Sequence, residues 1–110
     1  MKMIELKKGL YVVSGEIYMI YPRDCQKVEE GRTLVTREIR GDFRHAEYYF
    51  VGVVKNVERE RLVLNPATRY STYAVDFGHV YEKTTVLEKA EIPIENIEDI
   101  IGMEETNGKN

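Results

Sequence analysis

The stretch EYYFVGVVKNV, residues 47–57, decides the fold class of this chain. In an extended chain successive side chains point to opposite faces, so positions 49, 51, 53 and 57 share one face and positions 48, 50, 52 and 54 share the other. Both sets are apolar or aromatic apart from one glycine, and these residue types favour strands. An extended segment that is apolar on both faces is typical of a central strand, or of one with a face against a partner.

The residues that follow extend this strand into a hairpin. Glu58, Arg59 and Glu60 form a short charged turn, and residues 61–65 return as the second strand. Because proline lacks the amide hydrogen that a sheet ladder needs, Asn65-Pro66 is expected to end that strand.

The same two-residue apolar period, rich in Val, Ile, Tyr and Thr, recurs on both sides of the hairpin. A polar loop, residues 23–32, interrupts it, and residues 94–97 fit a single helical turn. A first extended region covers residues 10–13 and 17–21, with Ser14-Gly15 as a turn or bulge, and further strands are predicted at residues 33–39, 70–77, 80–87, 90–94 and 98–101.

No stretch has a long 3.6-residue apolar period, so the chain is predicted to be all-β. Six to eight short strands with tight turns indicate a small, strongly bent antiparallel barrel with an N-terminal β extension. A length of 110 residues suits one domain, which we place at residues 1–103. Residues 104–110 contain no apolar side chain and are expected to form a flexible tail.

Two segments carry a resemblance to a known family. Residues 50–65, FVGVVKNV followed by a charged turn and RLVLN, resemble the central hairpin of Sm-like barrels. Residues 92–101, IPIENIEDII, resemble the closing segment of Sm-like and other SH3-like small barrels, in which a strand, one helical turn and a final strand complete the barrel. The resemblance implies an SH3/Sm-like barrel, and Sm-like barrels form rings by pairing edge strands.

The RNA-binding pattern of that family does not carry over. Sm-like proteins have an Asp/Asn pair in the central hairpin and an Arg-Gly pair in a later loop. Here the hairpin turn is Glu58-Arg59-Glu60, and Arg40-Gly41 precedes the hairpin. The resemblance therefore predicts a fold and a mode of assembly, and assigns no RNA-binding residue.

The residue groupings that catalysis requires are largely missing. Of the potential metal ligands Cys25, His45, Asp76 and His79, only the last two are close in sequence, and zinc sites usually have paired ligands at close spacing. The chain also has no glycine-rich phosphate loop and no nucleophile signature. We predict a non-enzymatic protein without cofactor or metal, and keep a small metal-dependent enzyme as the last alternative.

The cysteine count, the apolar runs and the net charge indicate where the protein is located. The single cysteine allows no intramolecular disulfide, and the sequence has neither a signal-peptide pattern nor an apolar run long enough to span a bilayer. A cytoplasmic protein with no membrane role is therefore expected. The net charge of −3 does not draw the chain as a whole towards nucleic acid.

The distribution of that charge is more informative than its sum. Residues 1–74 contain 13 Lys and Arg against 10 Asp and Glu, a net of +3, whereas residues 75–110 contain 3 against 9, a net of −6. If the two segments lie at opposite edges of the domain, copies can join head to tail. Our leading hypothesis is thus a binding or assembly module that acts through homo-oligomerisation or a protein partner.

The second hypothesis is RNA or single-stranded nucleic-acid binding. Arginines interleave with aromatic residues in the middle of the chain, and such a surface stacks bases and grips phosphates. Acidic residues among the same arginines instead permit cross-strand ion pairs on a solvated face. The candidate residues are Arg69, Tyr70, Tyr73, Arg44 and Tyr48.

Overall fold

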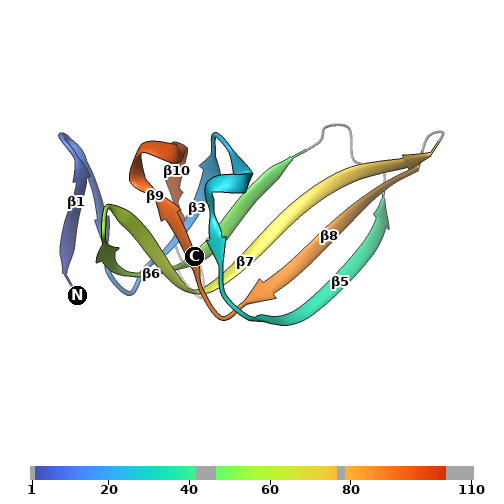
Figure 1. Cartoon of the computed structure of the whole chain (residues 1–110), viewed down its shortest axis with the longest axis horizontal. Helices are drawn as coiled ribbons and strands as arrows, with labels where there is room; N and C mark the ends of the chain where they lie inside the picture. The colour runs from blue at the N-terminus through green and yellow to red at the C-terminus, as the bar shows by residue number, and fades with distance from the viewer. Residues whose placement is uncertain (1, 42–46, 77–78, 104–110) are drawn as a thin grey trace, which may run out of the picture.

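A computed structural model describes residues 2–41, 47–76 and 79–103, and the chain in these ranges is built from antiparallel strands (Figure 1). In chain order the elements are β1 (Met3–Lys7), β2 (Leu10–Val13), β3 (Ile17–Pro22), the 3-10 turn η1 (Cys25–Lys27), β4 (Glu29–Glu30), β5 (Thr33–Gly41), β6 (Tyr48–Glu58), β7 (Arg61–Asp76), β8 (His79–Leu87), β9 (Ala90–Pro93), the 3-10 turn η2 (Ile94–Asn96) and β10 (Ile97–Gly102). The prediction of an all-β chain is confirmed. Within the described ranges, no helix is long and apolar enough to cross a membrane.

The main sheet has the order β10-β3-β6-β7-β8-β5, and β1 and β2 form a separate hairpin. β6 lies between β3 and β7, as the two-sided apolar pattern of its sequence predicts. The long strand β7 has two successive neighbours on its other side: Leu64 pairs with Ala90 of β9, and Ala67 pairs with Leu87 of β8. β8 and β9 thus follow the same side of β7, one after the other.

The prediction that Asn65-Pro66 ends a strand is wrong. β7 runs from Arg61 through Pro66 to Asp76 without interruption. Pro66 lies where β7 exchanges β9 for β8 and where its register with β6 shifts, so neither Asn65 nor Pro66 has a ladder partner in these pairings. The amide hydrogen that proline lacks is therefore not required at this position.

One face of the sheet forms the core. Ile20, Phe50, Leu64, Leu87 and Ile92 have no exposed surface, and they come from β3, β6, β7, β8 and β9. The β1–β2 hairpin adds Leu6 and Val12 to the same cluster. β1 was not predicted from the sequence, although it supplies part of the cover of the core.

The described strand pairs form an open path from β10 to β5, and no pairing links its two ends. The closing segment has the predicted order of strand, helical turn and strand in β9, η2 and β10. Closure into a barrel is not among the observed pairings and stays a prediction. The expected tail, residues 104–110, lies outside the described residues.

Candidate binding surfaces

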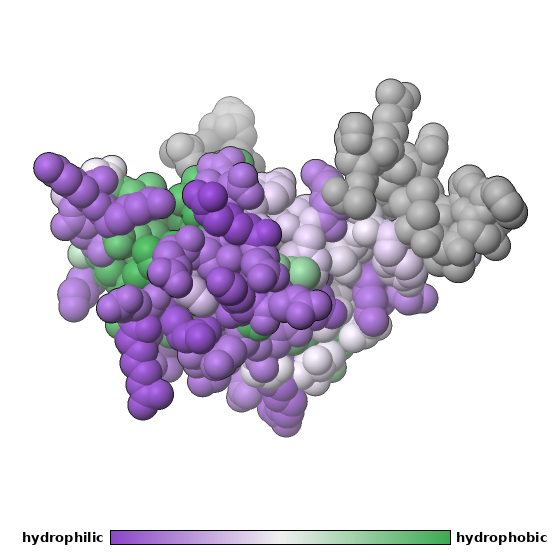
Figure 2. Space-filling view, turned by 45° about the horizontal axis from the view of Figure 1, so that its top comes forward, coloured by the Kyte–Doolittle hydropathy of each residue, from purple (hydrophilic) through white to green (hydrophobic). Residues whose placement is uncertain are grey.

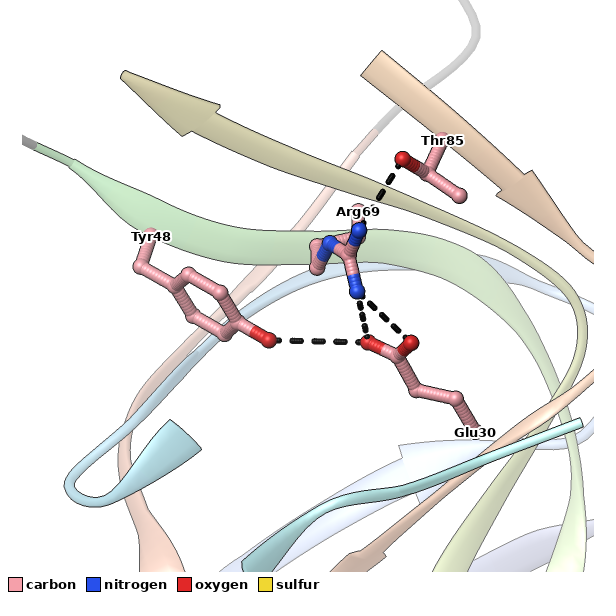
Figure 3. A network of polar contacts seen from close by, with 4 residues as sticks. All are labelled: Glu30, Tyr48, Arg69 and Thr85. Carbon is pink, nitrogen blue, oxygen red and sulfur yellow. Dashed lines mark hydrogen bonds and ion pairs between the residues drawn. The ribbon is translucent and has the colours of Figure 1, made fainter. Parts of the chain in front are cut away.

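A polar network lies on the core-facing side of the sheet, beside the buried cluster (Figure 3). Arg69 lies opposite Phe50 on one neighbouring strand and Thr85 on the other, so its side chain points to the same face as theirs. Arg69 Nη1 lies 2.6 Å from both carboxylate oxygens of Glu30, and Nη2 donates a 3.1 Å hydrogen bond to Thr85 Oγ1. Tyr48 Oη donates a longer hydrogen bond, 3.5 Å, to Glu30 Oε2.

The charges of Glu30 and Arg69 compensate each other within this network, and burial shifts the pKa values of its members. Burial raises the pKa of Tyr48 to about 12, and the negative charge of Glu30 adds to that rise. Burial lowers the pKa of Arg69, but the hydrogen bond and charge of Glu30 outweigh burial, and the pKa is raised overall. The Arg69 guanidinium therefore stays charged, and Glu30 neutralises it. Its Nε is buried and has no hydrogen-bond partner among the described residues.

The five predicted nucleic-acid residues do not share one surface. By strand alternation Tyr48, Arg69 and Tyr73 face the core side, whereas Tyr70 faces the outer side. Tyr73 is four residues beyond Arg69, about 13 Å along β7. Arg44 lies outside the described residues.

Tyr73 has its own partners at the far end of the sheet. Its hydroxyl donates a hydrogen bond to Glu38 on β5, which raises the pKa of Tyr73. Its ring stacks on that of Tyr81, with the ring centres 6.0 Å apart. Tyr73 therefore joins β7 to β8 and β5, and is not part of the Arg69 network.

On the outer face, three tyrosines form a row across β3, β6 and β7. The ring centres of Tyr21 and Tyr49 are 5.2 Å apart, and those of Tyr49 and Tyr70 are 5.0 Å apart with the rings nearly parallel. Sequence reasoning found Tyr70 but missed Tyr21 and Tyr49 as its neighbours, because their adjacency depends on the register of three strands. It also missed Glu30, which is 39 residues from Arg69 and lies in a segment predicted to be loop.

The two edge strands of the main sheet form a second kind of surface. β10 and β5 end the strand order at opposite sides, and each is paired along one edge in the part of the chain that the structure describes (Figure 1). Seven large apolar side chains are exposed in the described residues, and five of them lie on these strands or directly after β10. These five are between 41% and 51% exposed: Leu34, Val35, Ile39, Ile101 and Met103.

The edges also differ in charge. β5 carries Arg37, Glu38 and Arg40, a net of +1, and Glu38 is engaged by Tyr73. Neither arginine has an ion-pair partner among the described residues. β10 carries Glu98 and Asp99, a net of −2. The two edge strands thus carry net charges of opposite sign, although strands from both charged segments of the sequence lie at each end of the sheet.

Of the four potential metal ligands named from the sequence, the structure describes the side chain of Cys25 alone. Searching the described ranges finds no group of three or more His, Cys, Asp or Glu side chains that can hold a metal ion. Cys25 is exposed at the start of η1 and forms no disulfide. His45 and the side chains of Asp76 and His79 lie outside what the structure describes.

Comparison with known proteins adds no relative: no family model, no curated protein and no solved structure matches this chain.

Proposed function

We propose that this protein is a non-enzymatic assembly module whose copies join head to tail, with the β5 edge of one copy pairing with the β10 edge of the next. The observation that carries the proposal is the position of the exposed apolar side chains, five of which lie along these two edges. An edge strand presents unpaired backbone N–H and C=O groups, and natural proteins usually protect such strands with prolines, charges or a cover. β5 is nine residues long and contains no proline, and its charged residues Arg37, Glu38 and Arg40 are the protection that its sequence provides.

The charges on the two edge strands favour pairing of β5 with β10 over pairing of two identical edges. Two copies of β5 bring arginines together, and two copies of β10 bring carboxylates together, whereas β5 against β10 places Arg37 and Arg40 near Glu98 and Asp99. A contact between two different surfaces of the same chain closes into a ring if the rotation permits and otherwise forms a filament. Sm-like barrels, which the sequence resembles, also assemble through edge strands.

The fold included in this proposal is a small SH3/Sm-like barrel. The order β10-β3-β6-β7, with β9 beside β7 and η2 leading into β10, supports it. Hydrogen bonds near the β9–β10 junction tie that segment to the rest of the fold. The Ile94 amide donates to the Glu60 carbonyl at 3.0 Å, and the Arg23 amide donates to the Asn96 carbonyl at 2.7 Å.

The test is the oligomeric state of the purified protein by sedimentation velocity over a range of concentrations. We expect the unmodified chain to associate, and Ile39→Lys or Ile101→Lys to shift it towards monomer because each places a charge in the proposed interface. Met3→Lys is the matched control, since Met3 is an exposed apolar residue on the separate β1–β2 hairpin. A monomeric unmodified protein at every concentration overturns the proposal.

The tyrosine row favours single-stranded nucleic acid as a second candidate ligand, because bases stack on aromatic side chains. Arg69 contributes less to this candidate function, because its guanidinium already forms an ion pair with Glu30 and is not free to bind a phosphate. Salt-dependent binding to a single-stranded oligonucleotide tests it. Tyr70→Ala is expected to weaken binding, and an affinity that does not change with salt removes the candidate.

A further inference from the structure

An open groove of about 710 Å³ lies at the end of the molecule that carries the β1–β2 hairpin. Five separate segments form its walls: the end of β1, η1, β4, the β6–β7 turn and the β9–η2 junction. Figure 2 shows hydrophobic surface at this end, bordered by hydrophilic side chains. Leu6 and Ile94 are its large apolar lining residues.

Four cations from three of these segments line the groove, and among the described residues three of the four are unpaired. Lys7, Lys27 and Arg59 form no side-chain ion pair or hydrogen bond within the described part of the chain. The groove also contains three carboxylates, so its formal charge is +1, and one of these, Glu29, lies 3.7 Å from Arg61. Three unpaired cations, Lys7, Lys27 and Arg59, therefore line this partly apolar groove together with the two remaining carboxylates, Glu60 and Glu95.

Arg61 has a hydrogen-bond donor that nothing in the described residues satisfies. Its Nη1 is buried and has no acceptor, and its other terminal nitrogen, Nη2, lies 3.7 Å from Glu29 Oε2, which is longer than a hydrogen bond. A buried donor without a partner is costly to retain, so the Arg61 guanidinium gains if it turns towards an acceptor. The side chain as a whole is 29% exposed, so a ligand in the groove can contact its exposed part.

The turn that holds these arginines is strained. Arg59 and Glu60 have φ values of 53° and 61°, which are left-handed conformations that a two-residue hairpin turn normally fills with Asn-Gly. A hydrogen bond from the Ile94 amide to the Glu60 carbonyl holds the turn against η2. Strained conformations of this kind concentrate at functional sites, and this turn places Arg59 in the lining of the groove.

We infer that the groove binds an organic oxyanion with an apolar chain. Its phosphate or carboxylate oxygens accept hydrogen bonds from Arg61, Arg59 and Lys27, and its apolar part lies against Leu6 and Ile94. Arginine presents two parallel donors that match the oxygens of either headgroup. The groove includes no residue of β5 or β10, so this inference is independent of the proposed self-association.

Binding is tested by titrating the ¹⁵N-labelled full chain with octyl phosphate and octanoate, and separately with inorganic phosphate and octanol. We expect either organic anion to bind at least about tenfold more tightly than octanol or inorganic phosphate, because only the organic anions fill both parts of the groove. The amide shifts are expected at residues 27–29, 59–61 and 94–95. The ratio of the two affinities identifies the preferred headgroup. Equal binding of octanol, or no saturable shift at these residues, overturns the inference.

Two variants complete the test. Arg61→Gln is expected to weaken binding at least about fivefold, whereas Arg32→Gln, at an exposed arginine paired with Glu88 outside the groove, leaves it unchanged. The double variant Arg59→Asn with Glu60→Gly relieves the turn, so it is expected to raise the melting temperature while it weakens binding. Unchanged affinity in both groove variants contradicts the assignment.

Discussion

The two halves of β7 differ in what surrounds them. The first half lies between β6 and β9, and its Leu62 and Leu64 are completely buried. The second half lies between β6 and β8 as far as Ser71 and then pairs with β8 alone, and its Tyr70 and Tyr73 are partly exposed tyrosines with aromatic neighbours. One continuous strand thus belongs first to a packed core and then to an open sheet. The comparison indicates that stability resides mainly in the first half and that the second half is free to carry surface chemistry.

The largest expected loss of stability comes from a substitution in the packed first half of β7. Leu62→Ala removes a fully buried side chain, and the loss of burial together with the cavity is expected to lower the free energy of unfolding by about 2–5 kcal/mol. Tyr73→Ala, in the open half, is expected to cost about 1 kcal/mol or less. Urea unfolding measures both. Equal losses contradict the division of β7 into two halves.

The junction between the two halves of β7 can be tested by adding one methyl group to the neighbouring strand β6, in the variant Gly52→Ala. A Cβ at position 52 lies 2.7 Å from the carbonyl oxygen of Pro66, where β6 and β7 approach closely, so Gly52→Ala is expected to cost about 1–3 kcal/mol. Gly102→Ala is the matched control, because the nearest atom to a Cβ at position 102 is a Tyr18 ring carbon at 3.7 Å, an ordinary contact distance. Thermal and urea unfolding of the pair measure the difference, and similar stabilities argue against a close approach at this point.

The Glu30–Arg69 pair ties the open half to β4. Glu30→Gln leaves a largely buried guanidinium without its counter-charge, so we expect a loss of about 1–3 kcal/mol in the free energy of unfolding. Glu88→Gln removes the exposed pair with Arg32 and is expected to change stability by less than about 0.5 kcal/mol. If Glu30→Gln lowers the free energy of unfolding no more than Glu88→Gln does, the Glu30–Arg69 network does not stabilise the sheet.

The last expected effect appears only at alkaline pH and comes from Tyr48. Its pKa is about 12 in the folded chain against 10.0 ordinarily, so between these values the unfolded chain has lost the proton that the folded chain retains. Stability is therefore complete below pH 10 and declines as the pH rises through 12. Burial raises the pKa of Tyr49 as well, so Tyr48→Phe is expected to reduce the decline without abolishing it. Unfolding free energies measured from pH 9 to 12 check this, and a decline unchanged in Tyr48→Phe contradicts the assignment.

Local patterns in the sequence predict much of the fold. The apolar alternation of residues 47–57 indicates a central strand, and the sequence Ile94-Glu95-Asn96 indicates the helical turn before the last strand. The continuity of β7 through Pro66 is not predictable in this way, because it depends on the exchange of neighbouring strands at that point. Tertiary pairing there removes the need for the hydrogen bond that proline cannot make.

The candidate surfaces are less accessible to sequence reasoning. The pairing of Arg69 with Glu30 joins residues 39 apart, and no local signal marks it. The separation of Tyr70 from Arg69 onto opposite faces follows from strand alternation alone, once both residues lie in one strand. The charge difference between the two parts of the chain can be read from the sequence, but the opposite net charges of the edge strands β5 and β10 become apparent only from the strand order.

The central claim, head-to-tail assembly through β5 and β10, is tested most directly by mixing two blocked variants. Ile39→Lys blocks the β5 edge and Ile101→Lys blocks the β10 edge, so each alone is expected to be monomeric in sedimentation velocity. Mixed at equal concentration they retain one intact β5–β10 contact between unlike variants, and we predict a heterodimer that grows no further. If Ile101→Lys alone still forms the oligomer of the unmodified chain, or if the mixture stays monomeric, the head-to-tail arrangement is contradicted.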